Sequence, residues 1–287
     1  MQSYTITVTG ASGRLGTGVV RELHARGHRL LATDLVARRD LPVPVRVLNL
    51  LDREAVYALF EDTDVVVHLG NHPDISRGNA QYVFNENVTA NMNVFQAASE
   101  LGVKRMVFSS SIQVISGRRG LCDSAPCESE LPYLPLDGDV PANPGNAYAL
   151  SKQVTENMLA YYADKEGMDC VSVRFPLLMP MDRVEFFGHM GRAFRRYSKL
   201  DEAFLLLPYR DAARLVADIV DAELPGFRIY LPASQDNVFE IPLPDIVSRY
   251  YANVPLRQPL DQLRTLCDIS RIVEETGWQP TRLPSHH

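Results

Sequence analysis

The sequence predicts an α/β fold, a doubly wound parallel sheet covered by helices and followed by a small C-terminal lobe. Short apolar runs rich in β-branched residues alternate along the chain with segments whose apolar residues recur at helical spacing. A glycine-rich turn, GASGRLG, joins the first strand, over residues 4–9, to a helix over residues 15–25. Beyond about residue 179 the alternation breaks down. We therefore expect a core over residues 1–178 and a lobe over most of residues 179–287, with 206–234 returning to the core sheet.

The remaining core elements follow from local patterns. DVVVHLG, residues 64–70, is apolar almost throughout, as in a parallel strand buried on both faces. Long helices are expected over residues 82–101 and 147–165. Before the second of these helices lies a stretch of about thirty residues whose prolines prevent regular secondary structure. Loops of that length usually have a binding or lid function. Further strands are expected at residues 28–33, 43–50, 104–111, 169–178 and 227–231, and further helices at 53–60 and 211–222.

Composition and charge narrow the class of protein. The chain has 287 residues, of which 46% are hydrophobic and 22% charged, and a formal net charge of −6. This is ordinary for a globular protein, and because there is no basic stripe we expect no nucleic-acid partner. No apolar run is long enough to cross a bilayer, and the first strand begins too early for a signal peptide, so we expect a cytoplasmic protein with no membrane partner. The cysteines, expected to be reduced thiols, are Cys122, Cys127, Cys170 and Cys267.

The glycine-rich turn is typical of a dinucleotide site. Gly10 allows the tight turn after the strand, Gly13 lets the backbone approach a pyrophosphate, and Gly16 lets helix and strand pack closely. The phosphates would lie on free N–H groups at the positive end of the helix. A second strand ends at Asp34, about where such a unit places its ribose-binding carboxylate. The sequence therefore predicts a Rossmann-type core whose turn contacts the dinucleotide through Gly10, Ser12, Gly13, Arg14, Leu15 and Gly16.

Asp34 also indicates which dinucleotide is bound. A carboxylate at this position accepts hydrogen bonds from both ribose hydroxyls and repels a 2′-phosphate, so the expected cofactor is NAD rather than NADP. Arg38 and Arg39 follow a few residues later and could weaken this preference. We interpret them as part of a solvated basic loop.

Tyr148 and Lys152 are the expected catalytic pair. Four residues apart in YALSK, they share one face of a helix. Lowering the pKa of a phenol from about 10 to about 7 needs about 4 kcal/mol, which a nearby ammonium and a cationic nicotinamide could supply. Ser111 ends the neighbouring strand, where its hydroxyl could bind the same substrate oxygen. The structural alternative is an amphipathic helix with a buried tyrosine and a surface lysine, and the dinucleotide motif upstream favours the catalytic interpretation.

These motifs together resemble the extended short-chain dehydrogenases/reductases of the NAD-dependent epimerase/dehydratase group. GASGRLG, VVVHLG, a helix containing Asn87, VFSSS and YALSK occur in order over residues 5–180, and GWQP resembles the closing turn of the group. The resemblance implies that Tyr148 is the general acid/base, Ser111 the partner of the substrate oxygen and Lys152 the ribose anchor. It also implies a homodimer formed through the two long helices. Further cofactor contacts that it implies are the backbone at 68–70 and Asn49, Leu50, Leu69, Gly70, Asn87, Ser109, Tyr148, Lys152, Phe175 and Pro176.

Departures from the group's pattern concern the substrate. Asn49 stands where members often carry an adenine-binding Asp, and Ser111-Ile112-Gln113 stands where 4,6-dehydratases carry Thr-Asp-Glu, which argues against dehydration. About a hundred residues follow Pro180, fewer than nucleotide-sugar epimerases of the group usually have. That leaves room for a smaller substrate, as in the similar uronate dehydrogenases. Substrate contacts are expected from Asn71, His72, Ser110, Ser111, Gln113 and Arg183.

Two other sets of polar residues have competing interpretations. His68 and His72 are four residues apart but straddle a strand end and precede a proline, so we interpret them as core and loop residues and expect no metal. Three arginines could clamp a diphosphate, although a solvated helical face is the favoured interpretation. They are Arg192, Arg195 and Arg196.

The predicted function is NAD-dependent hydride transfer on a sugar or nucleotide sugar, as in the UDP-glucose 4-epimerase-like members of the group. Tyr148 removes a hydroxyl proton while hydride passes to the nicotinamide. An epimerase returns the hydride after the keto intermediate rotates, whereas a sugar or uronate dehydrogenase, the alternative, releases NADH. A regulator that only senses the dinucleotide is disfavoured because Tyr148 and Lys152 are both present. An NADP-linked aldehyde or ketone reductase is disfavoured by Asp34.

Overall fold

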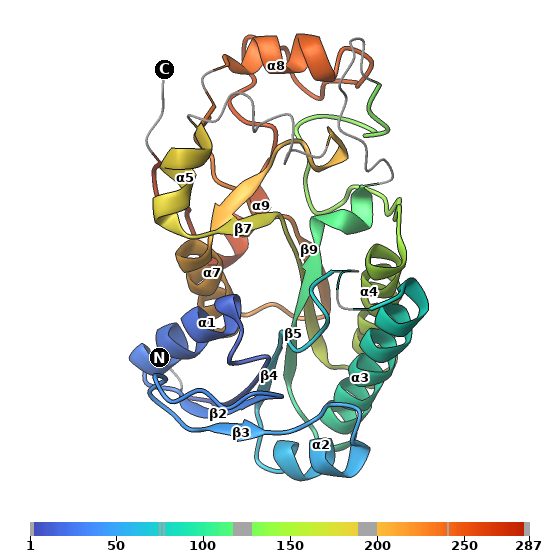
Figure 1. Cartoon of the computed structure of the whole chain (residues 1–287), viewed down its shortest axis with the longest axis vertical. Coiled ribbons are helices and arrows are strands. Elements are labelled where there is room, and N and C mark those ends of the chain that lie inside the picture. Colours follow the sequence, from blue (N-terminus) through green and yellow to red (C-terminus); the bar gives the residue numbers. More distant parts are fainter. Residues whose placement is uncertain are drawn as a thin grey trace.

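A parallel sheet built around β1 (Thr5–Thr9) forms the centre of the molecule (Figure 1). The computed structural model describes residues 3–74, 76, 78–116, 128–188, 200–239 and 241–283. Within them the sheet has seven strands in the order β3-β2-β1-β4-β5-β6-β9, all paired in parallel. The other strands are β2 (Arg29–Asp34), β3 (Val45–Val47), β4 (Val65–His68), β5 (Arg105–Ser111), β6 (Asp169–Phe175) and β9 (Phe227–Tyr230). The predicted doubly wound α/β fold is confirmed, and its switch point lies between β1 and β4.

Helices cover both faces of this sheet. α1 (Arg14–Ala25) packs against α7 (Tyr209–Asp221) on one face (Figure 1). On the other face α3 (Ala80–Glu100) packs against α4 (Ala147–Glu166) and α2 (Arg53–Phe60). The apolar residues of α7 recur at three- and four-residue spacing and are buried, so the burial of this face stabilises the layer.

α4 and β4 have local sequences that place the site. The Asn146 side chain accepts a hydrogen bond from the N–H of Ala149 at 3.0 Å and so begins α4 just before Tyr148. Gly167 ends the helix with a φ of 70°, a left-handed conformation that favours glycine. Every residue of β4 is buried, as predicted for its continuous apolar run.

Two predicted strands are shorter than expected. The strand predicted over residues 43–50 is limited to β3, at the edge of the sheet, and Pro44 has no N–H to pair there. The strand predicted over 169–178 breaks at Pro176 for the same reason. Residues 177–179 form β7 (Leu177–Met179) in a second sheet.

That second sheet has two strands, because β7 pairs in parallel with β8 (Leu206–Pro208). Within the range 206–234 that we expected to return to the core sheet, the strand that does so is β9. The lobe also contains α5 (Met181–Gly188), the 3-10 helix η3 (Leu200–Glu202), α8 (Leu243–Tyr250) and α9 (Ser270–Thr276).

The C-terminal segment is tied back to the core. Trp278, in the predicted closing turn, is buried, and its indole N–H donates to the carbonyl oxygen of Asp211 on α7 at 3.1 Å. Segment 128–146 joins the lobe through backbone bridges between Leu134 and Leu256 and between Leu136 and Cys267. None of the described helices combines the length and apolar character needed to cross a membrane.

Candidate functional site

The turn between β1 and α1 has a backbone that requires glycine. Gly10 has a φ of +68°, and a Cβ there would lie 2.7 Å from the backbone of Leu69. A Cβ on Gly16 would lie 2.1 Å from the carbonyl oxygen of Gly10. Gly13 is the N-cap of α1, and no side chain caps this end of the helix. The first turn, which contains Arg14 and Leu15, therefore offers backbone donors to an anion at the edge of the sheet.

Asp34 lies beside this turn, at the end of β2. Its Oδ2 accepts a hydrogen bond from the N–H of Ser12 at 2.9 Å. Arg38 donates to the carbonyl oxygen of Ser12 at 3.2 Å and forms an ion pair with Asp40. Arg38 therefore contacts the turn as well as the solvent, so our interpretation of it as a purely solvated residue is incomplete.

The turns after β3 and β4 lie against each other beside the glycine turn. A Cβ on Gly70 would lie 2.7 Å from a methyl carbon of Leu50. The Thr9 hydroxyl accepts hydrogen bonds from the N–H groups of Leu69 and Gly70, each at 3.2 Å. The side-chain oxygen of Asn49 accepts a hydrogen bond from the backbone N–H of Leu51 at 3.0 Å. This contact stabilises the turn that contains Asn49 itself.

Tyr148, Lys152 and Ser111 converge where α4 meets the end of β5. Tyr148 is buried and hydrogen-bonded to Ser111. The Lys152 Nζ donates to the carbonyl oxygen of Ser109 at 2.7 Å and lies 5.7 Å from the centre of the Tyr148 ring. Ser111 also accepts from the N–H of Gln113 at 3.2 Å. The structure thus brings together the three residues predicted to be catalytic.

Burial changes the pKa of both titratable members of this cluster. Desolvation raises the pKa of Tyr148 to about 12, although the hydrogen bond with Ser111 opposes the change. Desolvation lowers the pKa of Lys152 to about 7, and the negative charge of Glu156 opposes that change. In the chain without a cofactor, desolvation of the phenolate therefore outweighs any effect of the ammonium, and the lowered pKa of Tyr148 that we expect beside a bound nicotinamide stays a prediction. Lys152, in contrast, titrates near neutral pH.

A continuous set of hydrogen bonds connects Lys152 to the centre of the sheet. Lys152 donates to Asn71 Oδ1 at 2.8 Å, and Asn71 donates to Asn91 Oδ1 at 2.7 Å. His68 lies 2.7 Å from Asn91 Oδ1 through its Nε2 and 2.7 Å from the Thr9 hydroxyl through its Nδ1. Burial lowers the pKa of His68 to about 3, so its imidazole is neutral. His68 is a core residue, as predicted, and the Asn71 carboxamide is bound to Lys152.

Sequence reasoning missed two members of this network. Asn91 donates from Nδ2 to the Thr155 hydroxyl at 2.7 Å, and both residues are fully buried. A signal existed, because Asn91 follows Asn87 by four residues, which places two amides on the buried face of α3.

The loop after β4 is held in place by α3. Asn87 Oδ1 accepts from the backbone N–H of His72 at 2.8 Å, and Asn87 Nδ2 donates to the Ser151 hydroxyl at 3.2 Å. The His72 Nε2 lies 2.7 Å from a carboxylate oxygen of Glu86. Asn87 therefore connects this loop to α4 one residue before Lys152.

The other predicted site residues are spread around this centre. Ser110 is buried, and its hydroxyl donates to Glu156 at 2.7 Å. Gln113 accepts from the Asn146 amide at 3.4 Å, and Phe175 and Pro176 are buried where β6 ends. Arg183 is exposed on α5. The predicted residues outside the described part of the chain are Cys122, Cys127, Arg192, Arg195 and Arg196.

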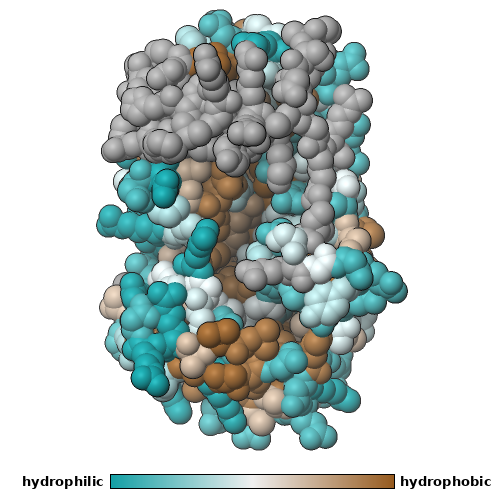
Figure 2. All heavy atoms as spheres, in the orientation of Figure 1, coloured by the Kyte–Doolittle hydropathy of each residue, from teal (hydrophilic) through white to brown (hydrophobic). Residues whose placement is uncertain are grey.

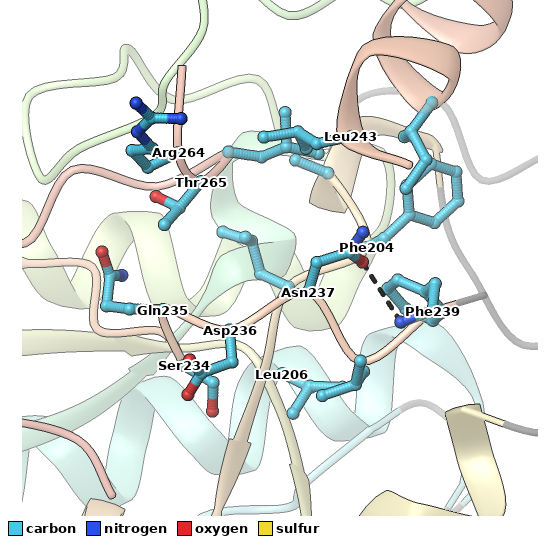
Figure 3. A pocket seen from close by; sticks show the side chains of 15 residues that line it. Phe204, Leu206, Ser234, Gln235, Asp236, Asn237, Phe239, Leu243, Arg264 and Thr265 are labelled. Carbon is cyan, nitrogen blue, oxygen red and sulfur yellow. Dashed lines mark hydrogen bonds between the residues drawn. The ribbon is translucent and has the colours of Figure 1, made fainter. Parts of the chain in front are cut away.

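The lobe contains a pocket that sequence reasoning did not predict (Figure 3). Much of its lining is apolar, from Phe204, Leu206, Val238, Phe239, Leu243 and Ile246 among others. Arg264 is one of its polar lining residues, and Asp236 is another, already paired with Arg282. The hydroxyl of Ser234 is buried and has no hydrogen-bond partner within the described residues. In the space-filling view, apolar side chains also line a hollow between the core and the lobe (Figure 2).

The residues around the β1–α1 turn fit a dinucleotide. Glycine leaves the turn without side chains, the uncapped start of α1 can receive a pyrophosphate, and Asp34 supplies a carboxylate for a ribose. With the Tyr148–Lys152 pair at the end of β5, this defines a dinucleotide-dependent oxidoreductase. The chain belongs to the NAD-dependent epimerase/dehydratase family, whose model matches residues 6–197, and its cofactor is NAD.

Individual relatives include both dehydrogenases and epimerases. The chain is 29% identical over 206 residues to the uronate dehydrogenase of Pseudomonas syringae pv. tomato, a match that spans 71% of this chain and 70% of that protein. It is 29% identical over 225 residues to the L-arabinose 1-dehydrogenase (NAD(P)(+)) of Haloferax volcanii, spanning 77% and 84%. A crystal structure of a UDP-galactose 4-epimerase aligns with a TM-score of 0.63 and 26% identity, covering 97% of this chain and 94% of that one. The predicted family and enzyme class are confirmed.

Proposed function

We propose that the protein is an NAD-dependent dehydrogenase of a small sugar or sugar acid and that it releases NADH. The observation that supports this most is the chemistry of the lobe pocket, which we propose receives the substrate. A nucleotide diphosphate carries negative charge that proteins bind with paired or clustered cations. Arg264 is the single cation among the described residues that line the pocket. One guanidinium suits the single carboxylate of a sugar acid, and the apolar walls suit the carbon face of a sugar ring.

The dehydrogenase relatives support the same proposal. By their names, one acts on uronates and the other on L-arabinose, and neither name includes a nucleotide sugar.

In the proposed reaction, this chain binds the substrate hydroxyl and removes its proton. Ser111 hydrogen-bonds the reacting oxygen and Tyr148 accepts its proton, which later passes to solvent. Lys152, fixed by Asn71 and the Ser109 carbonyl, supplies positive charge opposite the phenolate. The glycine turn, Asp34 and Lys152 would hold NAD, which accepts the hydride when bound.

An epimerase of a nucleotide sugar is the second candidate. It is favoured by the likeness to a UDP-galactose 4-epimerase over 97% of this chain.

A single assay separates the two candidates. Purified protein is mixed with NAD and a panel of free sugars, uronates and UDP- or GDP-sugars, and NADH absorbance is followed. Net NADH with a uronate or free sugar supports the dehydrogenase, whereas an isomerised nucleotide sugar without net NADH contradicts it.

A variant tests the role of the pocket arginine. Arg264→Gln should raise KM for a uronate about tenfold and leave KM for a neutral sugar unchanged. Arg53→Gln, on α2 and outside the pocket lining, is the matched control.

We also propose that two copies associate through α3 and α4. Tyr82, Met92, Leu150 and Tyr161 on these helices are exposed apolar side chains. Light scattering coupled to size exclusion tests this: a dimer is expected, and a monomer at micromolar concentration contradicts it. A cytoplasmic location remains a prediction.

A further inference from the structure

Three successive residues at the end of β5 each bind a different turn of α4. Tyr148, Lys152 and Glu156 follow one another at four-residue intervals on that helix, and all three are buried. Their partners at the end of β5 are Ser111 for Tyr148, the carbonyl oxygen of Ser109 for Lys152 at 2.7 Å, and the hydroxyl of Ser110 for Glu156 at 2.7 Å. The contact between Ser110 and Glu156 therefore joins the same face of α4 to the end of β5 as the two contacts of the catalytic cluster.

Glu156 also forms a buried ion pair with β6. The Arg174 Nη2 lies 2.7 Å from Glu156 Oε2 and the Arg174 Nε lies 3.0 Å from Oε1, while the Ser172 hydroxyl donates at 3.2 Å. Arg174 further donates to the carbonyl oxygen of Val140, in the segment that leads into α4, at 2.6 Å. A buried pair of this kind is a poor source of stability, because desolvating both charges offsets much of their attraction. Its position suggests a different role.

Several titratable side chains surround Lys152 and Tyr148. Within the described residues they include Tyr148 and Glu156 on α4, neutral His68 on β4 and, beyond Glu156, Arg174 on β6, while the negative charges of Asp74 and Glu202 act on Tyr148. α3 contributes the neutral amides of Asn87 and Asn91. Glu156 is the charge that acts on Lys152 against desolvation.

We propose that Glu156 is a positioning residue for the catalytic pair: held by Ser110 and Arg174, its carboxylate favours the ammonium form of Lys152 beside Tyr148. This inference rests on the proposed function, in which Lys152 must be positively charged. It also gives a role to Ser110, which we expected to contact substrate: its hydroxyl holds the carboxylate of Glu156. Burial without Glu156 would leave a neutral amine facing the phenol, and a neutral amine cannot stabilise a phenolate.

The test follows the titration of Lys152 itself. The chain has four lysines, so protein labelled with ¹³C at the lysine ε-carbon gives a sparse NMR spectrum, and the Lys152→Met variant assigns the Lys152 signal. Glu156→Gln keeps the size of the side chain and removes its charge. We expect the titration midpoint of Lys152 to fall by about one pH unit, a tenfold change in its proton affinity. A midpoint within about 0.2 units of the wild type overturns the proposal.

A second variant and a control complete this experiment. Glu156→Gln leaves the Arg174 charge buried and can fail to fold, so Glu156→Gln/Arg174→Met, which removes both charges, serves as the second variant. A smaller fall in the midpoint is expected than for Glu156→Gln, because this variant also removes the positive charge of Arg174, which disfavours the Lys152 ammonium, and an unchanged midpoint overturns the proposal. Glu275→Gln is the control. It removes the carboxylate on α9 that pairs with Arg228, and it should leave the titration midpoint of Lys152 unchanged. The titration needs no substrate, so a wild type that forms no NADH refutes the proposed function without deciding this result.

Discussion

The carboxylate of Asp34 accepts a hydrogen bond from the backbone N–H of Ser12 at 2.9 Å, so one contact joins the acid that we predict to bind the ribose and the turn that we predict to bind the phosphates. Asp34→Asn should weaken NAD binding about tenfold, because it removes a charge-assisted acceptor from both the turn and the ribose. Calorimetric titration with NAD measures this. An unchanged Kd for NAD would show that Asp34 serves the fold alone.

We expect Arg38 to influence how well the site accepts NADP. Its guanidinium contacts the Ser12 carbonyl, and Asp40 pairs with it at 2.6 Å. Asp40→Ala should free this charge for a 2′-phosphate and tighten NADP binding several-fold, while NAD binding changes little. Arg21, which also pairs with Asp40, provides the control: Arg21→Ala should leave the ratio of the two dissociation constants unchanged.

Replacing Tyr148 by Phe should abolish turnover with little loss of NAD affinity. The buried hydroxyl is the group placed to exchange a proton with substrate, and general acid–base catalysis contributes about 10²- to 10⁴-fold to a rate. NADH formation and NAD titration on the same preparation measure both quantities. Near-normal turnover in this variant would exclude the proposed mechanism.

Asn91 should be important for stability as well as for the site. It joins His68, Asn71 and Thr155 in one buried set of hydrogen bonds. Asn91→Leu should lower the free energy of unfolding by about 3 kcal/mol, because several buried polar groups lose a partner. Asn93→Leu, on the same helix, loses a single bond to the Leu50 carbonyl and should lower it by about 1 kcal/mol. Urea unfolding compares them, and equal effects would contradict the assignment.

Lys152 should give the protein a measurable dependence of stability on pH. Its pKa is about 7 in the folded chain, against a usual value near 10.5, so between these pH values the unfolded chain binds more protons. The stability contributed by this group therefore rises with pH above about 7 and is constant below it. Lys152→Met removes this dependence, so its free energy of unfolding relative to the wild type should fall by about 3 kcal/mol between about pH 6 and about pH 9. Urea unfolding at both pH values measures the difference, and a constant difference would contradict the low pKa.

The sequence by itself determined the features that depend on neighbouring residues. The GASGRLG turn, the apolar run of β4 and the four-residue spacing of Tyr148 and Lys152 follow from backbone geometry within a few positions. Such geometry is decided locally, which is why the parallel α/β core and the dinucleotide site were predictable. The break at Pro176 was also visible as a residue without an N–H, although the pairing of β7 with β8 was not.

The tertiary structure alone decided the electrostatics and the partners of the site. Ser110 is adjacent to Ser111 in the sequence, yet its hydroxyl binds Glu156 on another element. The pKa values of Tyr148 and Lys152 follow from burial, which depends on every segment packed around them, and in the chain without a cofactor desolvation raises the pKa of the tyrosine. The lobe pocket likewise brings together segments from residues 203–206, 234–246 and 264–266. Packing decides which distant segments touch and how much water they exclude. These properties therefore cannot be predicted from a local pattern in the sequence.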